Sequence, residues 1–170
     1  VRHVEKELRK DGMTDLGNRR AFDESFENVF SEAEFYQFSL ILLDIDNFKD
    51  VNDQFGHEIG DNVLSYFAGV VKHKCGAKDL AFRVGGDEFA IICFHQDPDY
   101  PNQIAESIQS KIDLTLTNSS GLEHQLTVSI GIASYTEQIQ TKGELFNAAD
   151  ASLYKSKRQG RNAINFFTDV

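Results

Sequence analysis

Several features that would assign the chain to a common class of protein are scarce or missing. Its 170 residues include only two cysteines, Cys75 and Cys93, which lack the spacing of a metal-binding motif. So few cysteines argue against a secreted scaffold that is stabilised by disulfide bonds, and they indicate two free thiols in a reducing cytosol. No stretch approaches the ~20 consecutive apolar residues that a membrane-spanning helix requires. The first ten residues, VRHVEKELRK, are charged throughout and do not resemble a signal peptide.

Positive charge is also in short supply. The chain carries 27 acidic and 17 basic residues, which give a formal net charge of −10 at pH 7. Nonspecific binding of nucleic acid needs a basic face that neutralises phosphates, so we expect no nucleic-acid partner. A small phosphorylated ligand is compatible with this composition if carboxylate-bound metal ions or a few lysines and arginines supply local positive charge.

The spacing of apolar residues predicts one α+β domain, for which this length provides a sufficient core. The first predicted helix begins at Asp15 or Asn18 and ends near residue 30, and the others span 60–74, 101–114 and 143–159. The predicted strands are 38–45, 80–84, 89–94, 125–135 and 162–167. The order β-α-β-β-α-β, followed by a further helix and strand, predicts a ferredoxin-like fold with an antiparallel sheet and helices on one face.

The N-terminal residues form a separate short segment. Val1, Val4 and Leu8 make an apolar stripe at helical spacing, which Asp11-Gly12 interrupts. The stripe fits either a terminal helix that frays or the end of a longer helix that enters from a preceding region, and one heptad does not separate these alternatives. We expect residues 1–10 to be the end of a linker helix and residues 11–170 to be the catalytic domain.

Two predicted strand ends carry carboxylates whose burial needs compensation. Asp87 and Glu88 lie in the tight turn of a predicted hairpin, and Asp44 and Asp46 end an apolar strand. In a β-α-β-β unit the first strand and the hairpin can be neighbours, so Asp44 can lie across from Asp87 and Glu88. Hard oxygen ligands from carboxylates and a substrate phosphate describe a Mg²⁺ site. Taken alone, an Asp-Glu turn fits a solvated hairpin tip, but the nearby Asp-Ile-Asp favours metal.

Residues beside these acids suit a phosphate ligand. Gly85 and Gly86 tolerate positive φ and let the backbone approach a phosphate closely, although two glycines also suit an ordinary turn. The segment after Asp-Ile-Asp offers backbone N–H groups and Lys49, which can cradle phosphates.

Taken together, these motifs resemble the GGDEF family, the diguanylate cyclases. The hairpin sequence RVGGDEF (83–89) is accompanied by four further blocks in the family's order. These blocks are DGMTDLGNRRAF (11–22), LDIDNFKDVNDQFGHEIGDNVL (43–64), TVSIGIA (127–133) and AADASLYKSKRQGRN (148–162). The resemblance covers nearly all of the chain from Asp11 to about Phe167.

The resemblance implies an activity and an assembly. Members of the family are similar to adenylyl cyclase cores and polymerase palms, and they act in bacterial signalling. They condense two GTP molecules into cyclic di-GMP and release two pyrophosphates. Each subunit holds one GTP, and each 3′-hydroxyl attacks the α-phosphate of the other nucleotide, so a homodimer is required for turnover.

The matching positions imply a metal site. Asp44, Asp87 and the carbonyl of Ile45 correspond to the family's ligands for two Mg²⁺ or Mn²⁺ ions per half-site. One ion would lower the pKa of the 3′-hydroxyl, and both would neutralise phosphate charge. Glu88 matches the second acidic position, where it either binds metal or helps to deprotonate the hydroxyl.

Other matching positions imply contacts to the triphosphate. Phe48 and Lys49 correspond to the triphosphate-binding turn, in which Lys49 is also counted as catalytic. Lys157 and Arg161 correspond to distal basic residues that contact phosphate. Their spacing of four predicts that both lie near one face of the last helix.

Asn52 and Asp61 correspond to the family's guanine-recognising pair. A carboxylate can accept from guanine N1–H and the exocyclic amine, and an amide can donate to O6 or N7. Adenine would leave Asp61 unpaired, which favours GTP over ATP. Asp61 also fits an acid stabilised by the dipole at a helix N-terminus, and both interpretations can hold.

The chain departs from the family at a regulatory site. Many members carry an Arg-x-x-Asp inhibitory site for the product shortly before the hairpin. Here the sequence is GAKD, so Asp79 is present but Gly76 replaces the arginine. Glycine supplies no guanidinium, and we expect weak or absent product inhibition. We expect Arg83 to brace the hairpin by pairing with an acid.

Three other functions are alternatives to a GTP cyclase. The main alternative is a catalytically silent module that binds GTP or cyclic di-GMP, but the intact hairpin motif favours an enzyme. The Asn52–Asp61 pair disfavours a cyclase for ATP, and a purely structural dimerisation domain leaves the converging acids unexplained. The resemblance also implies a preceding sensor or receiver domain. It implies a cytoplasmic location, where GTP is available, whether or not another part of the protein is tethered to a membrane.

Overall fold

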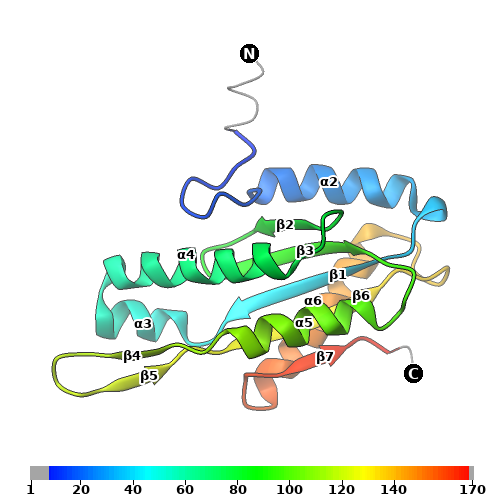
Figure 1. Cartoon of the computed structure of the whole chain (residues 1–170). Coiled ribbons are helices and arrows are strands. Elements are labelled where there is room, and N and C mark those ends of the chain that lie inside the picture. The colour runs from blue at the N-terminus through cyan, green and yellow to red at the C-terminus, as the bar shows by residue number, and fades with distance from the viewer. Residues whose placement is uncertain (1–7, 169–170) are drawn as a thin grey trace.

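A mixed five-stranded sheet forms the centre of the domain (Figure 1). The computed structural model describes residues 8–168. The strand order is β2-β3-β1-β6-β7, with bounds β1 (Phe38–Ile45), β2 (Leu80–Arg83), β3 (Glu88–Phe94), β6 (Val128–Ser134) and β7 (Ile164–Phe166). The central strand β1 is antiparallel to β3 and β6, and β7 adds a parallel edge strand to β6.

Four long helices cover the sheet. They are α2 (Arg19–Ser31), α4 (His57–Lys74), α5 (Tyr100–Lys111) and α6 (Lys142–Arg158). The elements β1-α4-β2-β3-α5-β6, in the order β2-β3-β1-β6, confirm the predicted ferredoxin-like core. The expectation of helices on one face holds for α4 and α5 only, because α2 and α6 cover the opposite face.

The central strand explains why both faces are covered. Every residue of β1 is buried. Ile41 and Leu43 belong to the core under α4 and α5, whereas Leu40 and Leu42 belong to the core under α2 and α6. A strand that is buried on both sides has a continuous apolar sequence rather than an alternating one.

Local signals fix two helices against this sheet. The Asn18 side chain accepts a hydrogen bond from the Ala21 N–H, so Asn18 rather than Asp15 caps α2. Gly131 on β6 allows the close approach of α6. A Cβ atom at position 131 would lie 2.2 Å from the backbone nitrogen of Leu153 and 2.4 Å from the carbonyl oxygen of Ala149.

Several short elements lie outside the predicted pattern. They are η1 (Ala33–Phe35), α3 (Phe48–Phe55) and the small hairpin of β4 (Thr115–Thr117) and β5 (Glu123–Gln125). Most of the predicted N-terminal apolar stripe, including Val1 and Val4, lies outside the described residues. Between residues 8 and 168, no helix is both long enough and apolar enough to cross a membrane.

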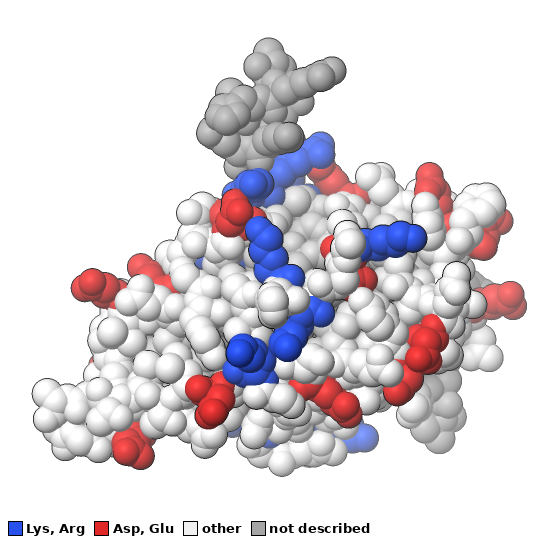
Figure 2. All heavy atoms as spheres, in the orientation of Figure 1, with Lys and Arg blue, Asp and Glu red and all other residues white. Residues whose placement is uncertain are grey.

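Charges of both signs are spread over the surface. On the face drawn in Figure 2, basic side chains form a narrow band across the middle, and acidic side chains surround it. This mixed pattern agrees with the excess of acidic residues in the sequence.

Candidate active site

A polar hollow lies where β1, the 83–88 hairpin turn, α3 and the end of α6 meet. Its volume is about 260 Å³. Of the residues expected to contact metal or phosphate, the hollow is lined by Asp44, Ile45, Phe48, Lys49, Asp87, Lys157 and Arg161. Asp46, Asn47 and Asp50 complete its lining, and Gly85, Gly86 and Glu88 are not part of it. The structure thus brings together residues that are more than 100 positions apart in the chain.

Asp44 is the buried carboxylate of this hollow. It is 5% exposed, and its Oδ1 atom has no hydrogen-bond partner among the described residues. Burial raises the pKa of Asp44 to about 7, the ion pair with Lys157 opposes the rise, and the negative charge of Asp87 adds to it. A buried carboxylate with a free oxygen has room for a further cationic partner.

Two more carboxylates converge on Asp44. Glu88 is the first residue of β3 and lies directly opposite Asp44 in the strand register. The carbonyl of Asp87 accepts from the N–H of Ile45 at 3.1 Å, which holds the turn against β1. One oxygen from each of Asp44, Asp87 and Glu88 lies within 4.8 Å of the other two. Hard oxygen donors at this spacing fit a Mg²⁺ or Mn²⁺ ion.

Lys157 supplies the positive charge next to these acids. Its Nζ atom pairs with Oδ2 of Asp44. Although partial burial disfavours the charged amine, the hydrogen bond and charge of Asp44, with Asp87 and Glu88, raise the pKa of Lys157. Lys157 therefore stays protonated and faces all three carboxylates.

The start of α3 contributes backbone donors. Asn47 precedes the helix in the left-handed conformation, with φ 55°, and its side chain makes no capping hydrogen bond. The first N–H groups of a helix have no partners within the helix and, with the helix dipole, favour an anion. Residues 47–50 line the hollow, and Lys49 is exposed at its rim. This arrangement can accept a phosphate group.

Asp46 differs from Asp44 although only Ile45 separates them. Its Oδ1 accepts from the Ser129 hydroxyl at 2.6 Å. Its Oδ2 accepts from the Thr127 hydroxyl at 2.7 Å and from the Asn162 N–H at 2.9 Å. Asp46 is 3% exposed, and a buried carboxylate needs a hydrogen-bond donor for each oxygen. The three donors meet this need without a metal.

Arg161 lies in a turn rather than on the last helix. The helix α6 ends at Arg158, and Arg161 has φ 66°. The prediction that Lys157 and Arg161 share a helix face is therefore wrong, because the chain leaves the helix between them. Both residues nevertheless line the hollow.

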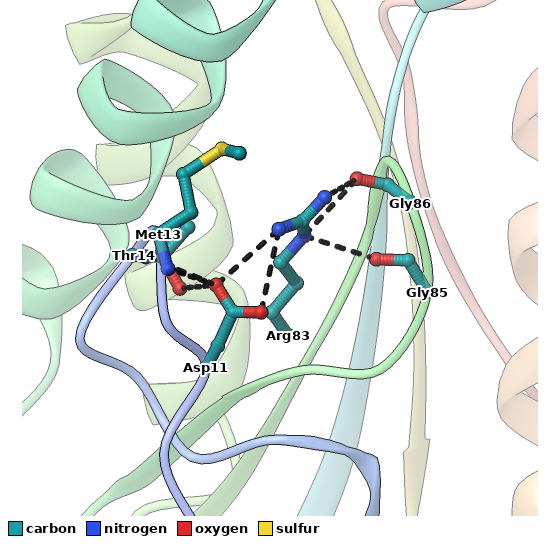
Figure 3. A network of polar contacts seen from close by, with 6 residues as sticks. All are labelled: Asp11, Met13, Thr14, Arg83, Gly85 and Gly86. Carbon is teal, nitrogen blue, oxygen red and sulfur yellow. Dashed lines mark hydrogen bonds and ion pairs between the residues drawn. The ribbon is translucent and has the colours of Figure 1, made fainter.

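Arg83 braces the turn that carries Asp87, as predicted. Figure 3 shows its guanidinium between Asp11 and the carbonyl oxygens of Gly85 and Gly86. Nη2 donates to Gly86 at 2.7 Å, Nε donates to both glycines at 3.1 Å, and Nη1 lies 3.3 Å from each carboxylate oxygen of Asp11. Asp11 also accepts from the N–H and the hydroxyl of Thr14. The brace joins the hairpin to the segment before α2.

The residues expected to recognise guanine lie on α3 and α4, and neither of them lines the hollow. Asn52 is half-buried on α3, and Asp61 is exposed on α4. Gly60 makes room for the Asn52 amide, because a Cβ atom there would lie 1.9 Å from Oδ1 of Asn52. Asn52 therefore packs against α4 at Gly60, the residue before Asp61.

The GAKD segment is closed by interactions within the chain. Oδ2 of Asp79 accepts from the Tyr100 hydroxyl at 2.7 Å and from the Gly76 N–H at 2.6 Å. A Cβ atom at Gly76 would lie 2.6 Å from the Tyr100 hydroxyl. A side chain at position 76 therefore cannot be added while Tyr100 keeps this hydrogen bond.

Sequence reasoning missed three contributors to the site. The role of Asp11 as the partner of Arg83, the hydrogen bonds of Asp46 and the space provided by Gly60 all depend on contacts between distant segments. The polar residues of the 127–129 segment, Thr127 and Ser129, were a usable signal for Asp46, since polar residues in a buried strand need partners.

Known proteins resemble the chain over almost its whole length. The family description "Diguanylate cyclase, GGDEF domain" matches residues 9–163. The uncharacterized protein YhcK of Bacillus subtilis is 38% identical over 160 residues, which are 92% of this chain and 45% of YhcK. The diguanylate cyclase DgcS of Shewanella oneidensis is 36% identical over 156 residues, which are 89% of this chain and 50% of DgcS.

Solved structures agree with these sequence matches. The coiled coil and GGDEF domain of DgcB from Caulobacter crescentus, crystallised in complex with c-di-GMP, has a TM-score of 0.89 and 33% sequence identity. The match covers 97% of this chain and 88% of that structure. The chain spans about half the length of YhcK and DgcS, and the compared region is the domain described above. Fold, motifs and relatives agree, and the chain belongs to the GGDEF-domain family, the diguanylate cyclase family.

Proposed function

We propose that the domain is a metal-dependent diguanylate cyclase that condenses two GTP molecules into cyclic di-GMP. The observation that carries the proposal is the convergence of three carboxylates, Lys157 and the start of α3 on one polar hollow. This set of groups provides hard ligands for a divalent ion beside donors for phosphate.

The proposed residue roles follow from position and charge. Asp44, Asp87 and the Ile45 carbonyl hold Mg²⁺ or Mn²⁺, which lowers the pKa of a bound hydroxyl and neutralises phosphate charge. Phe48 and the backbone N–H groups at the start of α3 receive the triphosphate. Lys49, Lys157 and Arg161 balance its negative charge, and Gly85 and Gly86 let it approach the turn. Asn52 and Asp61 bind guanine.

The proposed reaction joins two half-sites. The 3′-oxygen of one nucleotide bonds to the α-phosphorus of the other, and the bond from that phosphorus to the bridging oxygen of pyrophosphate breaks. The leaving pyrophosphate takes the electron pair. Glu88, exposed at the rim of the acidic cluster, is positioned to accept the hydroxyl proton. Because each subunit binds one GTP, two copies of the domain must face each other.

The alternative is a module that binds GTP or cyclic di-GMP without turnover. The side chains that carry the proposed chemistry are present and converge, which favours the enzyme.

Product formation at rising protein concentration tests the proposal. The domain is incubated with GTP and Mg²⁺, and the nucleotides are separated by chromatography. We expect cyclic di-GMP to form with a steeper than linear dependence on protein concentration and to be lost in Asp87→Ala. GTP binding without product at any concentration would support the silent module.

A second part of the proposal concerns the domain organisation and the location of the protein. Residues 8–10 form a turn and a bridge from Lys10 to Gly17, so the expectation of a helix is wrong for this part of the segment. We propose that the segment 1–10 connects a sensor or receiver domain to the catalytic domain, residues 11–170. Relatives about twice as long as this chain support a further domain. The catalytic domain would act in the cytoplasm, where GTP is available.

A further inference from the structure

We propose that Asp46 is a positioning residue that holds Arg161 at the phosphate hollow, and that it is not a metal ligand. This inference rests on the proposed function, because it assigns Arg161 a phosphate as its partner. It gives the two acids of the Asp-Ile-Asp motif different tasks.

The hydrogen bonds of Asp46 separate it from the acidic cluster. Each of its oxygens already accepts from a donor within the domain, and the donors are Ser129, Thr127 and the N–H of Asn162. Asp44, by contrast, has a buried oxygen without a partner and lies within the cluster of three carboxylates. A metal at Asp46 would have to displace charge-assisted hydrogen bonds, whereas a metal at Asp44 would satisfy an unpaired atom.

The Asn162 N–H connects Asp46 to the turn after α6. Gly160, Arg161 and Asn162 all have positive φ, at 104°, 66° and 48°. The left-handed conformation is unfavourable for arginine and asparagine and persists where surrounding contacts impose it. The N–H of Arg161 donates to the Ser156 carbonyl at 3.1 Å, and the N–H of Asn162 donates to Asp46. Gln109 on α5 donates to the Asn162 carbonyl at 2.9 Å.

This turn decides where Arg161 points. If α6 continued as a helix, residue 161 would lie further along the helix axis. Its backbone would then not be where the turn places it. The left-handed turn instead leaves Arg161 among the residues that line the hollow, together with Lys157 and Asp44. Because Asp46 is buried on the adjoining strand end, its carboxylate ties the turn to the same strand that carries Asp44.

A double-mutant cycle on nucleotide binding tests the proposal. The ligand is 3′-deoxy-GTP with Mg²⁺, which lacks the attacking hydroxyl and cannot react, and binding is measured by calorimetry. We expect Arg161→Ala to weaken binding about tenfold or more, the loss typical of a charge-assisted hydrogen bond. We expect Asp46→Ala to weaken binding to a similar extent in the wild-type background and less than twofold in the Arg161→Ala background.

Two further measurements separate positioning from metal binding and from general loss of structure. Mn²⁺ binding without nucleotide is expected to survive in Asp46→Ala and to be lost in Asp44→Ala. Hydrogen exchange at the Asn162 amide is expected to be faster in Asp46→Ala. Asp46→Asn serves if the alanine variant does not fold. The side-chain oxygen of the new asparagine can still accept from the Asn162 N–H, and its NH₂ group can donate to the Ser129 hydroxyl. The Asp46→Asn variant should therefore retain most nucleotide affinity.

The outcomes are distinct. Equal losses from Asp46→Ala in both backgrounds, or loss of Mn²⁺ binding in Asp46→Ala, would overturn the positioning role while leaving the proposed function standing. A loss of nucleotide affinity in folded Asp46→Asn as large as that in Arg161→Ala would also count against it. Failure of the wild-type domain to bind 3′-deoxy-GTP would instead refute the proposed function and, with it, the role assigned to Arg161.

Discussion

Asp44 and Lys157 show how single residues keep negative charge inside the domain. Asp44 is buried beside two other carboxylates, and the ion pair with Lys157 is its main compensation within the chain. Truncating one partner of a buried charge pair usually costs more than the pair contributes, because the other charge remains unpaired. The protonation state of Asp44 and the position of Lys157 should therefore respond to a metal ion.

The first prediction concerns pH. Burial raises the pKa of Asp44 to about 7 in the folded domain, above the ordinary aspartate value of 3.8. Without metal, the folded state therefore holds a proton that the unfolded state releases, and this contribution to stability is lost as pH rises towards 7. A divalent ion requires the ionised carboxylate, so metal binding should weaken below pH 7 and release a proton.

Thermal unfolding in a chelator and in Mg²⁺ checks this prediction. We expect the wild type to lose more stability than Asp44→Asn between pH 5 and pH 8 in the chelator. Saturating Mg²⁺ should remove that difference. The opposite sign, with wild type gaining stability relative to Asp44→Asn, would contradict the raised pKa.

The second prediction concerns Lys157. Because its amine occupies one oxygen of Asp44, Lys157→Gln should tighten Mn²⁺ binding by the nucleotide-free domain about tenfold, the scale of a charge-assisted hydrogen bond. The same change should weaken binding of 3′-deoxy-GTP. Lys155→Gln, an exposed lysine on the same helix, removes an equal charge and should alter neither affinity more than twofold. Equal effects of the two variants would show that only net charge matters.

At the scale of elements, the hairpin turn depends on the segment before α2. Arg83 and Asp11 are largely buried, with side chains 15% and 20% exposed, and they link this segment to two turn carbonyls. The Gly17 carbonyl also accepts from the Arg83 N–H at 2.8 Å. Displacement of the N-terminal segment would therefore loosen the turn that carries Asp87.

The third prediction tests this link. Arg83→Lys keeps the charge but cannot reach Asp11 and both carbonyls with one planar group. We expect turnover to fall 10- to 100-fold, because displacement of a catalytic group by about 1 Å has that effect. Asp11→Asn should show a smaller loss in the same direction. Arg20→Gln, which removes an exposed pair with Glu24, should leave turnover within about twofold. Wild-type turnover in Arg83→Lys would exclude a positioning role for the brace.

The fourth prediction concerns the loop before β2. Asp79 is engaged by Tyr100 and Gly76, and a side chain at position 76 would have to displace the Tyr100 hydroxyl. We expect added cyclic di-GMP to leave initial rates unchanged apart from competition at the active site. Gly76→Arg alone should not create inhibition, because the Tyr100 hydroxyl blocks the new side chain. Potent noncompetitive inhibition of the wild type would contradict this prediction.

At the scale of the whole molecule, the sheet separates two cores and presents the site at one end. Helices α4 and α5 pack on one face and α2 and α6 on the other, so β1 is rigidly enclosed. The acidic end of β1 and the turn of the hairpin lie at the same end of the sheet (Figure 1). Of the three carboxylates at this end, Asp44 is buried and Glu88 is exposed, so Glu88 is the one that can face a second copy in the proposed dimer.

Much of the fold was predictable because its signals are local. The apolar run 38–45 and the β-branched run near 125–135 predicted the central strands, and helical spacing predicted the four long helices. The short elements escaped because α3 has eight residues with only Val51 buried, and β4 and β5 have three residues each. Periodicity is not informative over so few positions.

The features of the candidate site also divide into those that local sequence predicts and those that depend on tertiary contacts. By itself, the sequence determined which chemistry is available, because carboxylates at two strand ends, a glycine turn and basic residues at and after the end of the last helix are fixed by residue type and order. Tertiary structure alone decided the hydrogen-bond partners of Asp46, the position of Arg161 in a turn and the partner of Arg83. Which donors meet a buried carboxylate depends on strands and turns that are distant in sequence, and no local pattern encodes those distances.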